Sequence, residues 1–185
     1  ILLMPGLGGD SNHFNWLARS LSHNGWPVVI LDHPGSDSLA LEDLLKGKLP
    51  LPGAEVIPDR MNDLDSVLQA KRLGKINFSP NKVVLMGHSL GALAAILASG
   101  VEIDDRLENN CEQVLDNLSL TNLSSLLQCQ LIDIKLSNRA NMENLTAIIG
   151  MNSFGSFLWQ KNLDNQINIP LFLTGGTFDL VTPSI

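Results

Sequence analysis

The pentapeptide Gly87-His88-Ser89-Leu90-Gly91 is the part of the sequence best suited to chemistry. It follows an apolar run at 82–86, read as a buried strand, and precedes an Ala/Leu-rich stretch to about Ser99, read as a helix. A serine on such a tight strand-to-helix turn has its hydroxyl pushed out of the sheet, and glycines at Gly87 and Gly91 leave room for the turn. The first turn of the helix favours negative charge near the serine. The pattern predicts Ser89 as a nucleophile for acyl transfer.

A glycine-rich loop, Pro5-Gly6-Leu7-Gly8-Gly9, follows the apolar run at 1–4 and precedes a helical pattern. In acyl transfer, a loop in this position offers a backbone N–H to the carbonyl oxygen as that oxygen gains negative charge. The second N–H comes from the residue after the nucleophile. We therefore expect the amides of Leu7 and Leu90 to form an oxyanion hole.

A dinucleotide-binding loop is the competing interpretation of the same glycines. The Gly-x-Gly-x-x-Gly pattern would use Gly6 and Gly8, but Ser11 stands where the third glycine is needed. Asp32 does end the next predicted strand, as the acidic residue of such a site would. Nucleotide binding therefore stays open as a minor alternative.

A serine nucleophile needs a base, usually histidine, and an acid that orients the base. Asp179 lies in the loop after the apolar run 169–174, at the sheet edge where Ser89 also emerges, and it is the predicted acid. Asp164 is a rival that comes well before this strand. All four histidines precede Asp179, whereas the expected chain order is serine, acid, histidine; they are His13, His23, His33 and His88. We expect the base to lie beyond Ile185.

The elements that must position these residues alternate between strands and helices. The predicted strands are continuous apolar runs, which indicates a mostly parallel, doubly wound sheet with helices on both faces, an α/β fold. A helix over 60–73 is expected, with Asp59 as its N-cap, and a helical turn over 39–45. Residues 102–141 are polar, rich in Asn and Leu, and are predicted to be a helical insertion. The strands are expected at 1–4, 27–31, 82–86, 145–150 and 169–174.

Composition and charge narrow the possible partners. The net charge is −7 and no block of Lys or Arg occurs, which argues against nucleic acid. No apolar run is long enough for a membrane span. No pattern indicates a metal or another cofactor. Cys111 and Cys129 fit either two buried thiols or a disulfide, which would imply an oxidising compartment.

The chain opens at Ile1, inside an apolar run, and closes at Ile185, just after a turn. We therefore expect residues 1–185 to be one partial domain that lacks one or two strands before Ile1 and the histidine-containing segment after Ile185. On this interpretation the polypeptide alone would be nearly inactive, and its compartment stays open.

These motifs together resemble the α/β-hydrolase superfamily over the whole chain. Within it they resemble the branch of platelet-activating-factor acetylhydrolases and predicted dienelactone hydrolases. The resemblance is carried by the segments 5–9, 31–36, 87–91 and 175–183, and by the segment between the cysteines, which is similar to that branch's insertion. One departure is Pro5, where the branch usually has histidine in its His-Gly loop.

The resemblance implies a serine hydrolase that cleaves a small carboxylic ester. Ser89 would be the nucleophile, Asp179 the acid, and the Leu7 and Leu90 amides the oxyanion donors. Two alternatives remain: a non-catalytic binding module on the same fold, or cleavage of a thioester, lactone or peptide by the same residues. The residues 102–141 would cover the pocket as a cap.

Overall fold

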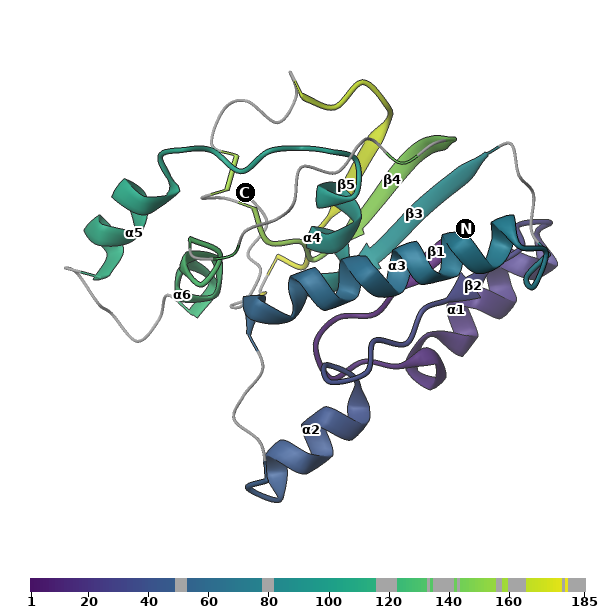
Figure 1. Ribbon diagram of the computed structural model, residues 1–185, viewed down its shortest axis with the longest axis horizontal. Helices are drawn as coiled ribbons and strands as arrows, with labels where there is room; N and C mark the ends of the chain where they lie inside the picture. The colour runs from purple at the N-terminus through teal and green to yellow at the C-terminus, as the bar shows by residue number, and fades with distance from the viewer. Residues whose placement is uncertain are drawn as a thin grey trace.

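In the part of the chain that the computed structural model describes, five parallel strands form one sheet with the spatial order β2-β1-β3-β4-β5 (Figure 1). This confirms the predicted α/β class, with the elbow strand β3 at the centre of the sheet. Leu3 of β1 pairs with Ile30 on one side and with Met86 on the other. The strands are β1 (Leu2–Met4), β2 (Val29–Ile30), β3 (Val83–His88), β4 (Leu145–Met151) and β5 (Leu171–Thr174).

The described residues are 1–48, 53–77, 82–115, 123–132, 134, 142, 144–155, 158–159, 166–177 and 179. Within them, no helix is both long and apolar enough to cross a membrane.

Helices cover both faces of the sheet. In Figure 1, α3 and α4 lie in front of the strands, α1 lies behind them, and α5 and α6 lie to the left of the sheet. A short 3-10 helix, η1 (Ala54–Val56), leads into α3. The α-helices are α1 (Ser11–His23), α2 (Ser38–Leu45), α3 (Ile57–Arg72), α4 (Leu90–Leu97), α5 (Leu107–Leu115) and α6 (Leu123–Cys129).

The core forms where α4 packs on β1, β3 and β4. Every residue of α4 is buried, because its small side chains let the helix approach the strands closely. Leu85 of β3 and Ile148 of β4 are fully covered beneath it. The helix that begins at Ser89 is therefore fixed by packing along its whole length.

The start of α3 differs from the sequence prediction. The helix begins at Ile57 rather than Arg60, its N-cap is Val56, and no side chain caps it, so the predicted N-cap role of Asp59 is wrong. Pro58 is the reason, since proline is tolerated in the first turn of a helix, where its missing N–H would have no partner. Asp59 instead lies in the first turn, where its charge favours the helix dipole.

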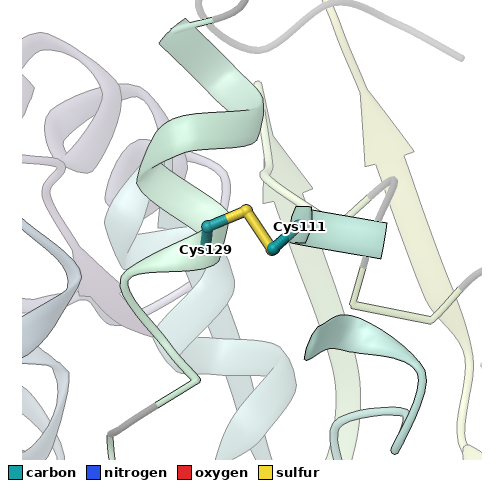
Figure 2. The surroundings of a disulfide bond; sticks show 2 residues. All are labelled: Cys111 and Cys129. Carbon is teal, nitrogen blue, oxygen red and sulfur yellow. A yellow bond between two sulfur atoms is a disulfide. The ribbon is translucent and has the colours of Figure 1, made fainter. Parts of the chain in front are cut away.

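A disulfide joins Cys111 of α5 to Cys129 of α6 (Figure 2). The structure thus decides between the two readings of the cysteines in favour of the crosslink. The Cys111 side chain is buried, and both residues contact the main apolar core. The disulfide joins two helices of the predicted insertion, and both cysteines pack against the core.

Candidate active site

Ser89 occupies a strained backbone position between β3 and α4, with φ 52° and ψ −119°. L-residues rarely adopt positive φ, and such strain persists only where the surroundings enforce it. Two glycines do so here. A Cβ on Gly87 would lie against the backbone of Gly91, and a Cβ on Gly91 would lie against the carbonyl oxygen of Met4, both inside the 3.0 Å that real Cβ atoms keep. The strand, turn and helix expected around Ser89 are present.

The loop 5–9 lies directly beside Ser89. A Cβ on Gly6 would be 3.0 Å from the Ser89 Cβ and 3.1 Å from the carbonyl oxygen of His88, so only glycine lets the loop come this close without displacement. No acceptor is found for the backbone N–H of Leu7 or Leu90 among the residues that the structure describes. Both residues line the same cavity as Ser89. Two unused donors thus lie near the serine.

The residue that sequence reasoning missed is Arg60, which is only 1% exposed. Its guanidinium donates to the carbonyl oxygens of Pro5 (2.6 Å), Gly6 (3.0 Å) and Ser36 (3.3 Å). Burial lowers the Arg60 pKa to about 10, against the opposing effect of the Asp63 and Asp37 charges. A signal was available, because position 60 falls at helical spacing among apolar residues that face the core: Ile57, Met61 and Leu64.

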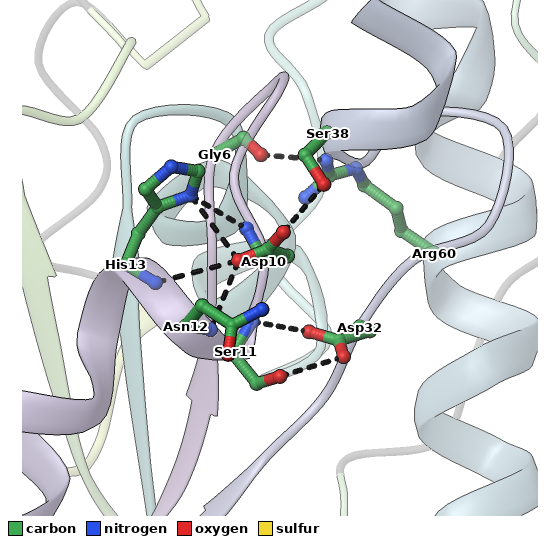
Figure 3. A network of polar contacts seen from close by, with 8 residues as sticks. All are labelled: Gly6, Asp10, Ser11, Asn12, His13, Asp32, Ser38 and Arg60. Carbon is green, nitrogen blue, oxygen red and sulfur yellow. Dashed lines mark hydrogen bonds and ion pairs between the residues drawn. The ribbon is translucent and has the colours of Figure 1, made fainter. Parts of the chain in front are cut away.

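A second polar network holds the base of the same loop (Figure 3). Asp10 caps α1 by accepting from the amides of Asn12 and His13, and it also accepts from the Ser38 hydroxyl at the start of α2. The Ser38 bond is the main cause that lowers the Asp10 pKa. The loop is therefore joined to two helices through one carboxylate.

The environment of Asp32 weighs against the nucleotide alternative. Its two oxygens accept from the Ser11 amide at 2.6 Å and the Ser11 hydroxyl at 2.9 Å (Figure 3). In a dinucleotide site the corresponding carboxylate would hold a ribose hydroxyl. Here the carboxylate is occupied in fixing α1 to the end of β2.

Asp179 is half-buried in the loop after β5, and its carboxylate accepts from the side-chain amide of Asn152, the residue after β4. The sheet's hydrogen bonds continue across these loops. The Ser89 N–H donates to the Met151 carbonyl (2.8 Å), and the Asn152 N–H donates to the Thr174 carbonyl (2.7 Å). Backbone hydrogen bonds therefore connect Ser89 to the end of β4, and the residue after β4 to the end of β5, which precedes Asp179.

His88 is the last residue of β3 and directly precedes Ser89. Burial lowers its pKa, while the charge of Asp179 acts in the opposite direction, so the carboxylate is close enough to be felt by the ring. The ring packs on Phe14, with centroids 5.8 Å apart. The ring is not among the residues that line the cavity at Ser89.

The remaining histidines are engaged elsewhere. His33 is buried and its Nδ1 lies 2.9 Å from a carboxylate oxygen of Asp63, and burial lowers its pKa. His13 lies in the first turn of α1, and its Nδ1 accepts from the Asp10 N–H at 3.2 Å. His23 lies at the exposed end of α1. None of these three lines the cavity over Ser89.

A cavity of about 200 Å³ opens over Ser89. Its wall is mostly apolar, and α6 supplies part of it. Gln128, the polar residue that α6 contributes, is 1% exposed. The lining residues are Leu7, Gly53, Ser89, Leu90, Leu93, Leu127, Gln128 and Phe154. Among the described residues, no group of three or more His, Cys, Asp or Glu could hold a metal ion.

Comparison with known proteins agrees with this geometry. A sequence model described as "Alpha/beta hydrolase family" matches residues 1–142, a span that includes the glycine-rich loop, Arg60 and the turn at Ser89. No curated protein matches the chain.

Proposed function

Because the chain belongs to the alpha/beta hydrolase family, we propose that it is a serine hydrolase that cleaves a carboxylic ester through an acyl-enzyme. Family membership supports hydrolase activity in general. The observation that carries the finer proposal is the backbone of Ser89, strained at φ 52° beside a cavity and beside two amides that have no acceptor among the described residues. Strain of this kind is kept at functional sites, where it holds a reacting group in place.

In the proposed reaction the Ser89 oxygen attacks the ester carbonyl, and its proton passes to a histidine. The N–H groups of Leu7 and Leu90 donate to the resulting oxyanion. The histidine then protonates the departing alcohol, and water releases the acid from the serine by the same steps in reverse order. We propose that this histidine follows Asp179 in the chain, which puts it outside residues 1–185.

We propose Asp179 as the acid that orients this histidine. Two observations support the role: the carboxylate is half-buried near the ring of His88, and it is held by Asn152. A carboxylate that is held in place fixes both the tautomer and the direction of an imidazole bound to it. Asn152 would act through Asp179 and would not touch the substrate.

We propose further that residues 1–185 are part of one α/β-hydrolase domain and that residues 102–141 form its cap. The cavity position of Leu127 and Gln128, both in α6, supports this proposal. The apolar wall would receive the acyl group, since burial of each methylene contributes about 0.8 kcal/mol. The resemblance of this insertion to that of the platelet-activating-factor acetylhydrolase and dienelactone hydrolase branch is the reason to propose that branch.

The test is labelling of the full-length protein with a fluorophosphonate, together with hydrolysis of p-nitrophenyl esters of increasing acyl length. Ser89→Ala should abolish labelling and lower kcat by about 10⁶-fold, since loss of a serine nucleophile in a triad costs about that much. Ser99→Ala is the matched control, because Ser99 follows the same helix and its hydroxyl donates to the Ile96 carbonyl, its one partner among the described residues. Unlabelled wild-type protein, or labelling that survives Ser89→Ala, would rule out the serine mechanism and favour a binding module.

A further inference from the structure

The burial of Arg60 calls for an explanation that the helix itself does not supply. Arginine is almost never fully buried unless it is paired, because removing its charge from water is costly. Arg60 is 1% exposed, and among the described residues its guanidinium donates to three backbone carbonyls and to no carboxylate. Two of those carbonyls belong to the loop beside Ser89. The buried guanidinium thus orients the peptide groups of this loop.

The direction of the loop amides follows from peptide geometry. In a trans peptide the C=O and the N–H of one unit point in opposite directions, and no cis peptide bond occurs among the described residues. The Gly6 carbonyl points to Arg60 and also accepts from the Gly9 N–H at 3.2 Å. The Leu7 N–H, in the same peptide unit, must therefore point away from Arg60.

Ser89 lies beside the same peptide unit. The loop approaches the Ser89 Cβ at Gly6, and Leu7 lines the cavity with Ser89. The opposite end of the loop is held as well, since the Gly8 N–H and Arg60 both donate to the Ser36 carbonyl, at 2.9 and 3.3 Å. Rotation of the Gly6–Leu7 peptide would break the Arg60 bond.

We propose that Arg60 is a positioning residue that aims the Leu7 N–H at the oxyanion formed on attack by Ser89. The inference rests on the proposed function and adds to it a residue that touches neither substrate nor reacting atoms. Because the donor is aimed at the transition state, its loss should lower kcat and leave KM nearly unchanged. A purely structural arginine would instead change stability alone.

The experiment compares Arg60→Lys and Arg60→Met in the full-length protein. We expect Arg60→Met to lower kcat by about 10²-fold, which is the low end of the effect of removing one oxyanion donor. Arg60→Lys, which keeps the charge but not the planar fork, should fall between Met and wild type. Affinity for an alkyl boronic acid, which forms a tetrahedral adduct with serine, should fall in parallel with kcat.

The matched control is Leu64→Ala on the same helix, which is equally buried but contacts no loop carbonyl through a polar group. It should lower stability while kcat per mole of folded protein stays at the wild-type value. Unchanged kcat in Arg60→Lys and Arg60→Met, or a loss of kcat with unchanged boronate affinity, would overturn the inference.

The two proposals can fail separately. If Arg60→Met does not fold, Arg60→Lys decides by the same two readouts, because it fills nearly the same volume. Wild-type protein without turnover that depends on Ser89 would remove the proposed function, and this inference with it. Normal wild-type turnover that every folded Arg60 variant leaves intact would remove the inference alone.

Discussion

The turn at Ser89 and the α5–α6 segment both contribute to the cavity wall, but different forces hold them. The turn is fixed by close packing, with all of α4 buried and two glycines against neighbouring backbone. The helix α6 is only seven residues long, too short to be stable alone, and a disulfide fastens it to α5. Ser89 thus belongs to a closely packed part of the described chain, and the outer wall is held by a covalent bond.

This difference suggests a division of roles. A nucleophile must be held to within fractions of an ångström, which close packing of backbone against backbone provides. A wall that only limits the size and shape of the substrate can be built from a segment whose residues are less closely packed. Substitutions in the first region should act on folding and reaction rate, and those in the second on substrate range.

The largest effect is expected at the packed turn. Gly91→Ala places a methyl group against the Met4 carbonyl oxygen, where neither backbone can move without displacing β1 or α4. We expect a loss of about 3 kcal/mol or more in the free energy of unfolding, measured by urea denaturation.

Gly47→Ala is the matched control, since Gly47 also becomes alanine but has nothing within 4 Å of the new methyl group. Its φ of 70° should make the change cost only about 1–2 kcal/mol. Equal losses for Gly91→Ala and Gly47→Ala would mean that the backbone of Met4 does not pack tightly against Gly91.

The disulfide provides the complementary test in the second region. The double substitution Cys111→Ser and Cys129→Ser opens a loop with a sequence separation of 18, which should cost about 3 kcal/mol of stability. In protein that remains folded, the rate of fluorophosphonate labelling should stay close to wild type, while the preference among acyl chain lengths should broaden. A loss of labelling with an unchanged chain-length profile would reverse the proposed division of roles.

The smallest expected effect concerns the strain at Ser89 itself. Glycine tolerates positive φ, so Ser89→Gly should be more stable than Ser89→Ala by about 1 kcal/mol, although both lack the hydroxyl. The comparison separates backbone strain from loss of the nucleophile, and thermal unfolding of the two variants measures it. A more stable alanine variant would show that the turn is not under strain.

The parts of the site that could be predicted from sequence are those with local causes. The turn at Ser89 can be predicted from the pentapeptide 87–91 alone, because the glycines and the flanking apolar runs are all within a few residues of Ser89. The position of Asp179 after a strand is equally local. The fold class followed from the alternation of apolar runs with helical spacing.

The parts that could not be predicted depend on residues far apart in the chain. The spacing of Cys111 and Cys129 fits a bond or two thiols equally well, and only the placement of α5 beside α6 decides. Asn152 contacts Asp179 across two strand ends, which no pattern near position 152 reveals. Arg60 is an intermediate case, since its place on the apolar face of α3 was visible, but its partners were not.

The strand order has a consequence for how the protein acquires its site. Leu3 and Met86 are neighbours in the sheet although more than eighty positions separate them along the polypeptide, and the loop after β1 meets Ser89 only because of that pairing. Contacts between residues so far apart in sequence form slowly, because closing the intervening loop lowers the chain entropy before the contacts stabilise the fold. During refolding, competence to react with a fluorophosphonate should therefore appear no earlier than the sheet.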